Sequence, residues 1–148
     1  MFPSLRPSER AAIVGVIDPS SKTAGTPATS GWIKADKFFN YQGICQTGVL
    51  GASATFNAKF EQATDASGTG VKDVTGKAIT QLVKATDDNK QAVIELRPDE
   101  LDIQNGFYWF RLSQTHGTAN GISAGLVLGF DPRYAPPAQA ATVAEVAR

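Results

Sequence analysis

The chain contains one histidine, His116, and this residue limits the hydrolytic chemistry that the sequence can support. A nucleophilic hydrolase holds a nucleophile, a general base and an orienting group together, and histidine is the usual base near neutral pH. His116 stands in the segment 114–118, Gln-Thr-His-Gly-Thr, between an expected strand and a glycine-rich turn. We interpret it as a loop residue that hydrogen-bonds its neighbours. An esterase reaction is therefore not expected.

Carboxylates are a second possible source of chemistry, because a glycosidase needs only two of them. The available candidates include Glu61, Asp65, Asp73, Glu95 and Asp99. The surrounding sequence marks no two of these as a pair, and we expect them to lie on the solvated faces of strands. The sequence therefore predicts that the protein is not an enzyme.

A metal or cofactor site is not expected either. Asp99, Glu100 and Asp102 form a dense acidic group, but their spacing is not that of a metal-binding loop. They are better placed to charge the start of a helical turn that Pro98 would open. Cys45 is the one cysteine, which rules out an internal disulfide and a cysteine-rich zinc site.

The segment 68–78, Gly-Thr-Gly-Val-Lys-Asp-Val-Thr-Gly-Lys-Ala, invites comparison with a phosphate-binding loop. Such a loop needs four residues between its two glycines and a serine or threonine directly after the lysine. Here five residues separate Gly70 from Gly76, and Ala78 follows the lysine. We therefore expect a long hairpin loop and no nucleotide site.

Composition narrows the class of protein further. The 148 residues are 42% hydrophobic, which suits one domain with a substantial core. The 14 Lys and Arg residues balance the 14 Asp and Glu residues, so no net charge attracts nucleic acid or anionic lipid. No apolar run approaches the ~20 residues that span a bilayer, and the first ten residues do not resemble a secretory signal. We expect synthesis and folding in a cytosol, with neither nucleic acid nor membrane as a partner.

Hydrophobic residues recur at every second position along the body of the chain, which predicts β-strands. In the segment 54–60, two alanines and two phenylalanines alternate with polar residues. Segments 91–97 and 121–131 repeat this pattern, and in the second the large even-numbered residues, Ile122 to Phe130, are expected to form the buried face. Further strands are expected at 11–18, 31–37, 41–50, 78–83 and 107–112, with turns that include 18–21, 66–70 and 117–121. Roughly eight strands of this kind predict an all-β fold, an antiparallel β-sandwich of jelly-roll type.

Two terminal segments differ from this body. Residues 1–10 carry prolines and no periodicity, which predicts an extended N-terminal arm, and residues 11–134 form the sandwich domain. Residues 135–148 form a tail rich in proline and alanine, expected to be either a frayed helix or a second extended arm. Extended arms of small β-proteins can add to a neighbour's sheet, although simple terminal disorder is the alternative. Phe2, Leu5 and Arg6 are therefore candidate interface residues.

Four successive aromatic residues at 107–110 must fall on both faces of a strand. Tyr108 and Phe110 are expected to enter the core, which leaves Phe107 and Trp109 facing outward. An outward aromatic pair can bind a sugar, contact another protein, or line the space under a loop. Phe107 and Trp109 therefore join the candidate interface residues.

The chain resembles small structural proteins of tailed bacteriophages that are encoded near the major capsid protein. The resemblance spans about residues 11–137 and is carried by Gly48–Leu82, Asn89–Asp102 and Leu128–Pro136. It implies a head decoration (cement) protein: a β-sandwich, commonly a homotrimer, that binds the major capsid protein on the outside of the virion where capsomers meet. No catalytic, cofactor or metal residue comes with the resemblance.

Two other functions stay open at this point. A carbohydrate-binding module is compatible with outward Phe107 and Trp109, and such a module on a virion could bind glycans of the host surface. The other alternative is a component of the connector between head and tail. Such a component would also be part of the virion but would occur in few copies per particle.

Overall fold

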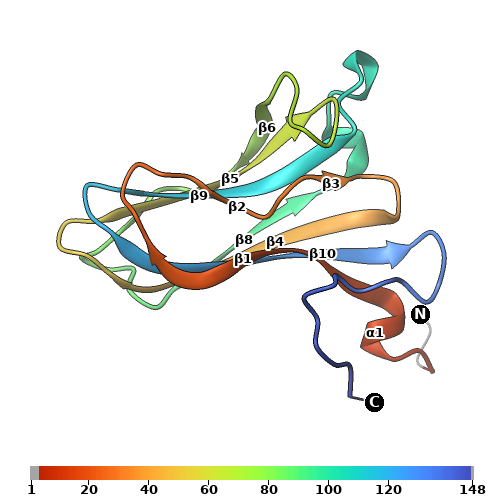
Figure 1. Cartoon of the computed structure of the whole chain (residues 1–148), viewed down its shortest axis with the longest axis horizontal. Helices are drawn as coiled ribbons and strands as arrows, with labels where there is room; N and C mark the ends of the chain where they lie inside the picture. The colour runs from red at the N-terminus through yellow and green to blue at the C-terminus, as the bar shows by residue number, and fades with distance from the viewer. Residues whose placement is uncertain (1–3, 148) are drawn as a thin grey trace.

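The structure, a computed structural model of the chain, describes residues 4–147 (Figure 1). Its elements are α1 (Pro7–Arg10), β1 (Ala11–Lys22), β2 (Ala28–Thr29), β3 (Ile33–Lys34), β4 (Phe38–Leu50), β5 (Thr55–Ala63), β6 (Lys72–Ala78), β7 (Leu82–Val83), β8 (Gln91–Leu96), two 3-10 turns (Pro98–Glu100 and Ile103–Asn105), β9 (Trp109–Gly117) and β10 (Gly121–Pro132). No helix among the described residues is long and apolar enough to cross a membrane.

The strands form two antiparallel sheets that face each other (Figure 1). Sheet 1 has the order β1-β10-β4-β8, and sheet 2 has the order β2-β9-β5-β6, with β3 also paired to β9 and β7 to β5. The first half of the chain pairs with the second half in mirrored order, as β1 with β10, β2 with β9, β4 with β8 and β5 with β6. This is a long hairpin rolled into two layers, which is the jelly roll. The fold class expected from the sequence is confirmed.

The core lies between the two sheets and is rich in aromatic side chains. Tyr41, Phe60 and Phe110 are fully buried, and Phe110 meets the other two edge-on at centroid distances of 4.7 and 5.5 Å. The expected alternation in β5 is confirmed, because Phe56, Ala58 and Phe60 all point inward. Edge-to-face aromatic pairs add about 1 kcal/mol each beyond the area that they bury.

The expected inward face of β10 is wrong. Ile122 and Leu126 are exposed, while the small residues that alternate with them, including Gly125 and Gly129, are buried. The reason is the close approach of core side chains to the β10 backbone. A Cβ atom on Gly129 would lie 2.5 Å from the Phe38 ring, and one on Gly125 would lie 2.6 Å from the Gln114 amide. Only the face of β10 that carries small side chains fits against the core, so the face that carries large side chains is turned outward.

Three other local expectations also change. Tyr108 is 46% exposed and precedes β9, so Phe110 enters the core without it. The turn expected at 18–21 lies inside β1, where the register with β10 shifts between Ile17 and Ser20. Pro7–Arg10 form one helical turn within the expected extended arm. The turn expected after Arg97 is present, with Pro98 at its first position.

The C-terminal tail lies along the outer edge of β1. The Ala140 N–H donates to the Ile13 carbonyl at 2.8 Å. The Gln139 side chain accepts from the Ile13 N–H at 2.8 Å and donates to the Ala11 carbonyl at 3.2 Å. The sequence left two alternatives for residues 135–148, a frayed helix or an extended arm. The described part of this tail contains no helix.

Candidate protein interface

The outer face of sheet 1 carries an apolar row that crosses all four strands. Val16 lies opposite Leu126, Leu126 opposite Ile44, and Ile44 opposite Val93. Directly opposed residues of neighbouring strands share one face of the sheet. Leu126 and Val93 are 36% and 52% exposed, and Val16 and Ile44 are half-buried. We call these four residues the apolar row.

The rungs on both sides of the apolar row are mostly uncharged. On one side Leu128 lies opposite Gln42, which lies opposite Glu95. On the other side Ala124 lies opposite Gln46, which lies opposite Gln91. Glu95 is the one charged residue among those named in these rungs and the row, and on β1 the exposed Asp18 lies two residues beyond Val16. Exposed apolar area rimmed by amide groups is typical of a protein interface.

A hollow of about 560 Å³ lies where α1 meets this face of sheet 1. Leu5 and Pro7 line it from the N-terminal side, and Phe130 and Asp131 line it from β10. Leu5 is 40% exposed, so an apolar side chain stands at the mouth of the hollow. Through Phe130 the hollow continues the outward face of β10.

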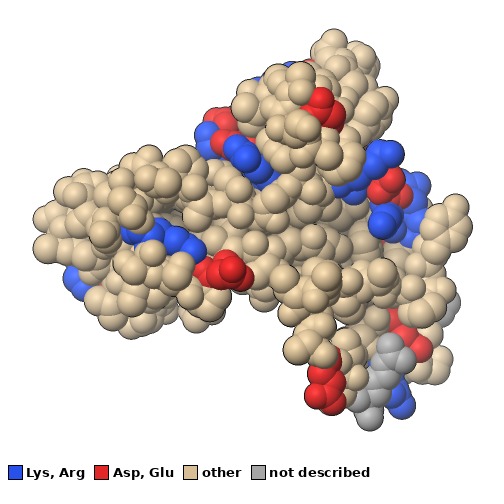
Figure 2. Space-filling model, viewed as in Figure 1, with Lys and Arg blue, Asp and Glu red and all other residues tan. Residues whose placement is uncertain are grey.

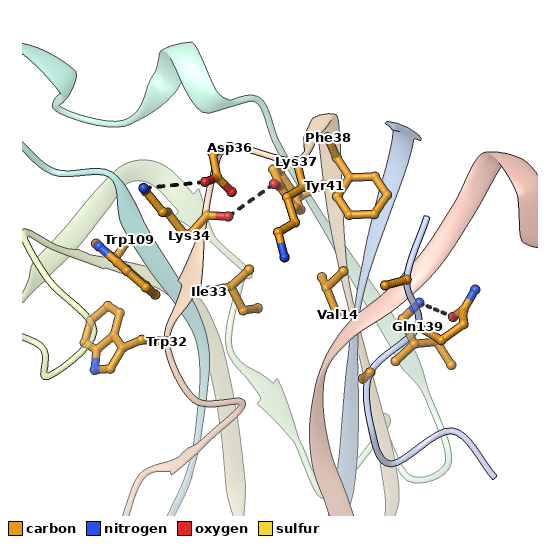
Figure 3. Close-up of a pocket in the computed structure, with 13 residues that line it drawn as sticks. Val14, Trp32, Ile33, Lys34, Asp36, Lys37, Phe38, Tyr41, Trp109 and Gln139 are labelled. Carbon is orange, nitrogen blue, oxygen red and sulfur yellow. Dashed lines mark hydrogen bonds and ion pairs between the residues drawn. The ribbon is translucent and has the colours of Figure 1, made fainter. Parts of the chain in front are cut away.

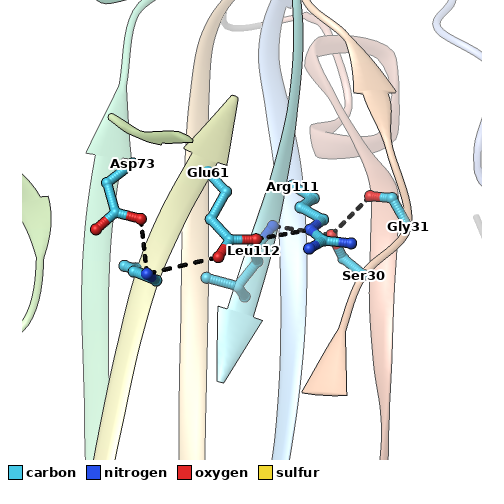
Figure 4. A network of polar contacts seen from close by, with 7 residues as sticks. Ser30, Gly31, Glu61, Asp73, Arg111 and Leu112 are labelled. Atoms are coloured by element: carbon cyan, nitrogen blue, oxygen red, sulfur yellow. Dashed lines mark hydrogen bonds and ion pairs between the residues drawn. The ribbon is translucent and has the colours of Figure 1, made fainter. Parts of the chain in front are cut away.

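Sheet 2 presents a different outer face, covered by a network of ion pairs (Figure 4). Lys59 Nζ lies 2.6 Å from Asp73 Oδ1 and 3.5 Å from Glu61 Oε1, and Arg111 Nε lies 2.8 Å from Glu61 Oε2. The hydrogen bond to Asp73 raises the pKa of Lys59. The Arg111 guanidinium also lies 4.5 Å from the centre of the Trp32 ring. These charges neutralise one another, and Figure 2 shows charged side chains in separate clusters with wide uncharged areas between them.

The five interface residues predicted from the sequence do not form one site. Phe2 lies outside the described residues. Leu5 lies beside sheet 1, and Arg6 caps α1, because its N–H donates to Glu9 Oε2 at 2.7 Å. Phe107 and Trp109 belong to the sheet 2 side of the molecule, and the ammonium group of Lys72 lies 4.0 Å from the centre of the Phe107 ring.

Trp109 and Trp32 line one hollow of about 420 Å³ between the edges of β1 and β3 (Figure 3). Val14 and Gln139 stand on the opposite side of it in the same view. Polar groups line the sheet 2 side, where Lys34 Nζ and Asp36 Oδ2 lie 3.5 Å apart. Sequence reasoning found Trp109 but missed Trp32, which stands outside the aromatic run 107–110.

The apolar row was also missed, although the sequence carries a signal for it. β10 alternates large residues with Gly121, Ser123, Gly125 and Gly129, and a strand that packs its large side chains inward has no need of glycine on the other face. Glycine at every fourth position on one face of a strand, here 121, 125 and 129, indicates that another backbone or a large side chain approaches closely. The glycine face was therefore the better candidate for the core.

His116 is a buried strand residue, so its interpretation as a loop residue is wrong. It lies in β9 with no exposed surface, and its Nε2 is 2.9 Å from Ser123 Oγ. Burial lowers the pKa of the imidazole, and Nδ1 has no hydrogen-bond partner among the described residues. A histidine base needs a second group to orient it and access to substrate. The His116–Ser123 pair has neither.

Metal-binding geometry is likewise not found in the part of the chain that the structure describes. No three histidine, cysteine or acidic side chains of residues 4–147 come together in a way that could hold an ion. Cys45 is buried in the core, and burial raises the pKa of its thiol to about 11, so it stays protonated at neutral pH.

Comparison with known proteins identifies structures of similar architecture and no family. No protein-family model matches the chain, and no curated protein matches it. A chain of the Triatoma virus empty capsid is 7% identical with a TM-score of 0.48, and the match covers 84% of this chain and 88% of that one. A chain of the cowpea mosaic virus empty particle is 10% identical over 88% and 85%, with a TM-score of 0.45. The SPBc2 prophage-derived protein YomS is 12% identical over 80% and 99%, with a TM-score of 0.39. Similarity at this level does not indicate the function of this chain.

Proposed function

We propose that the protein is a structural, non-enzymatic component of a tailed-phage virion that decorates and stabilises the outer capsid surface. In this proposal it is a homotrimer bound to the major capsid protein where capsomers meet. The observation that carries the proposal is the apolar row on the outer face of sheet 1, where Leu126 and Val93 are exposed and Val16 and Ile44 are half-buried. The sequence resemblance to head decoration proteins supports the choice of partner.

Such a protein would work by shape and multiple attachment. A molecule that binds the assembled shell and not its separated capsomers stabilises the shell by mass action. Three copies in a closed ring would bind a three-fold site at three places, so that weak contacts combine into a durable attachment. The chain has 14 basic and 14 acidic residues and so no net charge. In this proposal the attachment therefore depends on apolar contact.

Purified virions of the phage that encodes the chain provide the first test. We expect the protein in a copy number comparable with that of the major capsid protein, measured by quantitative mass spectrometry. A few copies per particle would contradict decoration and favour a connector between head and tail. Absence from the particle would contradict both.

Binding to undecorated capsids provides the second test. Leu126→Asp places a charge in the centre of the apolar row and should weaken binding at least tenfold, a cost of about 1.4 kcal/mol per contact. Val71→Asp is the matched control, because Val71 is 48% exposed in the loop before β6 and lies outside sheet 1. Equal binding by the two variants, with both folded by circular dichroism, would show that sheet 1 does not face the capsid.

The second candidate function is glycan binding at the hollow that Trp32 and Trp109 share. Paired indole rings beside polar groups are a common means of holding a sugar. We expect glycan-array signal that disappears in Trp109→Ala while the fold is retained, and that persists in Phe107→Ala, because Phe107 is stacked under Lys72 outside the hollow. A blank array for the wild-type chain would count against this candidate.

A further inference from the structure

The two sheets expose four strand edges, and three of them are protected against pairing with another chain. The edge of β1 is covered by Gln139 and Ala140 and has two shifts in its register. β2 and β3 are two residues long. β6 pairs with β5 through an irregular register and contains Gly76 at φ +74°. Short strands, bulges and covering segments are the usual means of blocking edge-to-edge association.

The edge of β8 lacks these protections. Its six residues keep an unbroken register with β4, from Tyr41 opposite Leu96 to Gln46 opposite Gln91. The sequence of β8 contains no proline, glycine or lysine. A hollow of about 470 Å³, lined by Val93 and Glu95 on one side and by Gly76 and Ala78 on the other, runs beside it. On this side β8 is the last strand of sheet 1, and the hollow separates it from β6 of sheet 2.

The ladder between β4 and β8 shows which backbone groups face this space. The Thr47 N–H donates to the Lys90 carbonyl at 2.9 Å, and antiparallel strands exchange hydrogen bonds at every second residue. Ala92, Ile94 and Leu96 are therefore bonded to β4, and Gln91, Val93 and Glu95 direct their N–H and C=O groups to the free edge. The run ends there, because the Arg97 N–H and carbonyl are both bonded to Glu100.

We propose that two copies of the chain pair through this edge, antiparallel and centred on Val93, so that sheet 1 continues from one molecule into the other. A two-fold axis at Val93 sets Val93 opposite Val93 of the second copy and Gln91 opposite Glu95 of the second copy. All three N–H and all three C=O groups of each edge then find partners. No like charges face each other, and the Gln91 amide can donate to the Glu95 carboxylate.

The apolar row supports the same partner. It ends at Val93 on the edge strand. In the proposed pair the row of one copy meets the row of the other, and the outer face of sheet 1 becomes one apolar strip across eight strands. A self-complementary patch of this kind is what a two-fold interface requires. The proposal goes beyond capsid decoration and does not depend on it; where trimers form, the β8 edge would link two of them.

Sedimentation of the purified full-length chain tests the pairing. We expect the mass to double with rising concentration, from monomer to dimer or from trimer to hexamer. Val93→Pro removes the central N–H of the free edge, which has no role in the β4 ladder, so it should abolish the doubling and leave the fold intact. Val93→Thr keeps the N–H and the branched shape of the side chain, so this variant should still show the doubling of the mass. A wild-type mass that stays constant up to the solubility limit would overturn the proposal.

Charge at Gln91 tests the register. Gln91→Glu sets two carboxylates opposite each other at two symmetric places and should raise the dissociation constant by about two- to thirtyfold. Gln91→Lys sets opposite charges at the same places and should lower it. Both substitutions lie on an exposed position, so the fold should not change. Equal effects of the two variants would contradict pairing about Val93. Gln91 lies outside the apolar row, so capsid binding by Gln91→Glu reports separately on the decoration function.

Discussion

At the scale of single residues, the most informative position is His116, because its burial decides both its chemistry and its effect on stability. The ring packs against Phe56 at a centroid distance of 5.1 Å and meets Ser123 across the sandwich. Burial, and to a lesser degree the positive charge of Lys22, lowers the pKa of the imidazole. The residue that the sequence marks as the best catalytic base is therefore held neutral and away from solvent.

This burial predicts a pH-dependent stability. Below a pH of about 6.5 the unfolded chain protonates its histidine, while the folded chain holds His116 neutral until the lower folded pKa is reached. Unfolding then takes up a proton, so the free energy of unfolding should fall as the pH decreases from about 7.5 to about 5. Urea unfolding over this range measures the effect.

His116→Gln supplies the control, since it keeps a polar side chain that does not titrate. It should be less stable at pH 7.5 but show a flatter profile over the same range. The carboxyl groups of Asp65, Asp88 and Asp102, whose pKa values are lowered by hydrogen bonds, lose their contribution only below a pH of about 4. A wild-type profile as flat as that of the variant would contradict the assignment.

At the scale of elements, period-two patterning located the long strands whose one face lies against a single core. It missed β6, because residues 72–78 were expected to belong to a hairpin loop, and the strand expected at 78–83 is only the two-residue β7. β5 and β8 follow this rule, and their buried residues were predicted correctly. β10 breaks it, since Phe38 and Gln114 occupy the space that its large side chains would have needed. Which face of a strand is buried depends on the opposite sheet, and a single strand's sequence does not contain that information.

The orientation of β10 predicts an unusual order of mutational costs. Val127 is fully buried and Leu126 is 36% exposed, so the smaller side chain contributes more to the core. Val127→Ala should lower the free energy of unfolding by about 1–3 kcal/mol, and Leu126→Ala should lower it by less than about 1 kcal/mol. Urea unfolding of the two variants side by side gives the comparison. The reverse order would mean that the large face of β10 is the buried one.

The interface shows a similar limit of prediction. Leu5 could be named as a candidate from the sequence because an apolar residue in a segment without periodicity has no partner of its own, and it lines the hollow beside sheet 1. Val16, Ile44 and Val93 could not, because they become neighbours only through pairing of β1, β10, β4 and β8, which are far apart along the chain. Phe107 and Trp109 were grouped because they are close in sequence. In the structure Phe107 lies under Lys72, whereas Trp109 lines the hollow with Trp32.

At the scale of the whole molecule, the two outer faces differ in kind. Sheet 2 carries ion pairs that neutralise one another, such as Arg111 with Glu61, and sheet 1 carries the apolar row. Any association through sheet 1 should therefore depend on apolar contact more than on charge.

Salt provides the corresponding prediction. Raising sodium chloride from about 0.05 to about 0.5 M shortens the range of electrostatic attraction severalfold. We expect the affinity of the chain for itself or for a capsid to stay constant or increase over this range, and ammonium sulfate to increase it further. Fluorescence anisotropy with a labelled chain measures this. A tenfold loss of affinity at high salt would point to the charged face of sheet 2 as the binding surface.

The position of α1 and of the C-terminal tail has a practical consequence for protein engineering. Both lie at one pole of the sandwich, and the turns that join β4 to β5 and β9 to β10 lie at the other (Figure 1). A reporter or peptide fused to either terminus would project from the same pole. Because Gln139 fastens the tail to β1, cargo attached beyond it would be displayed from a fixed point.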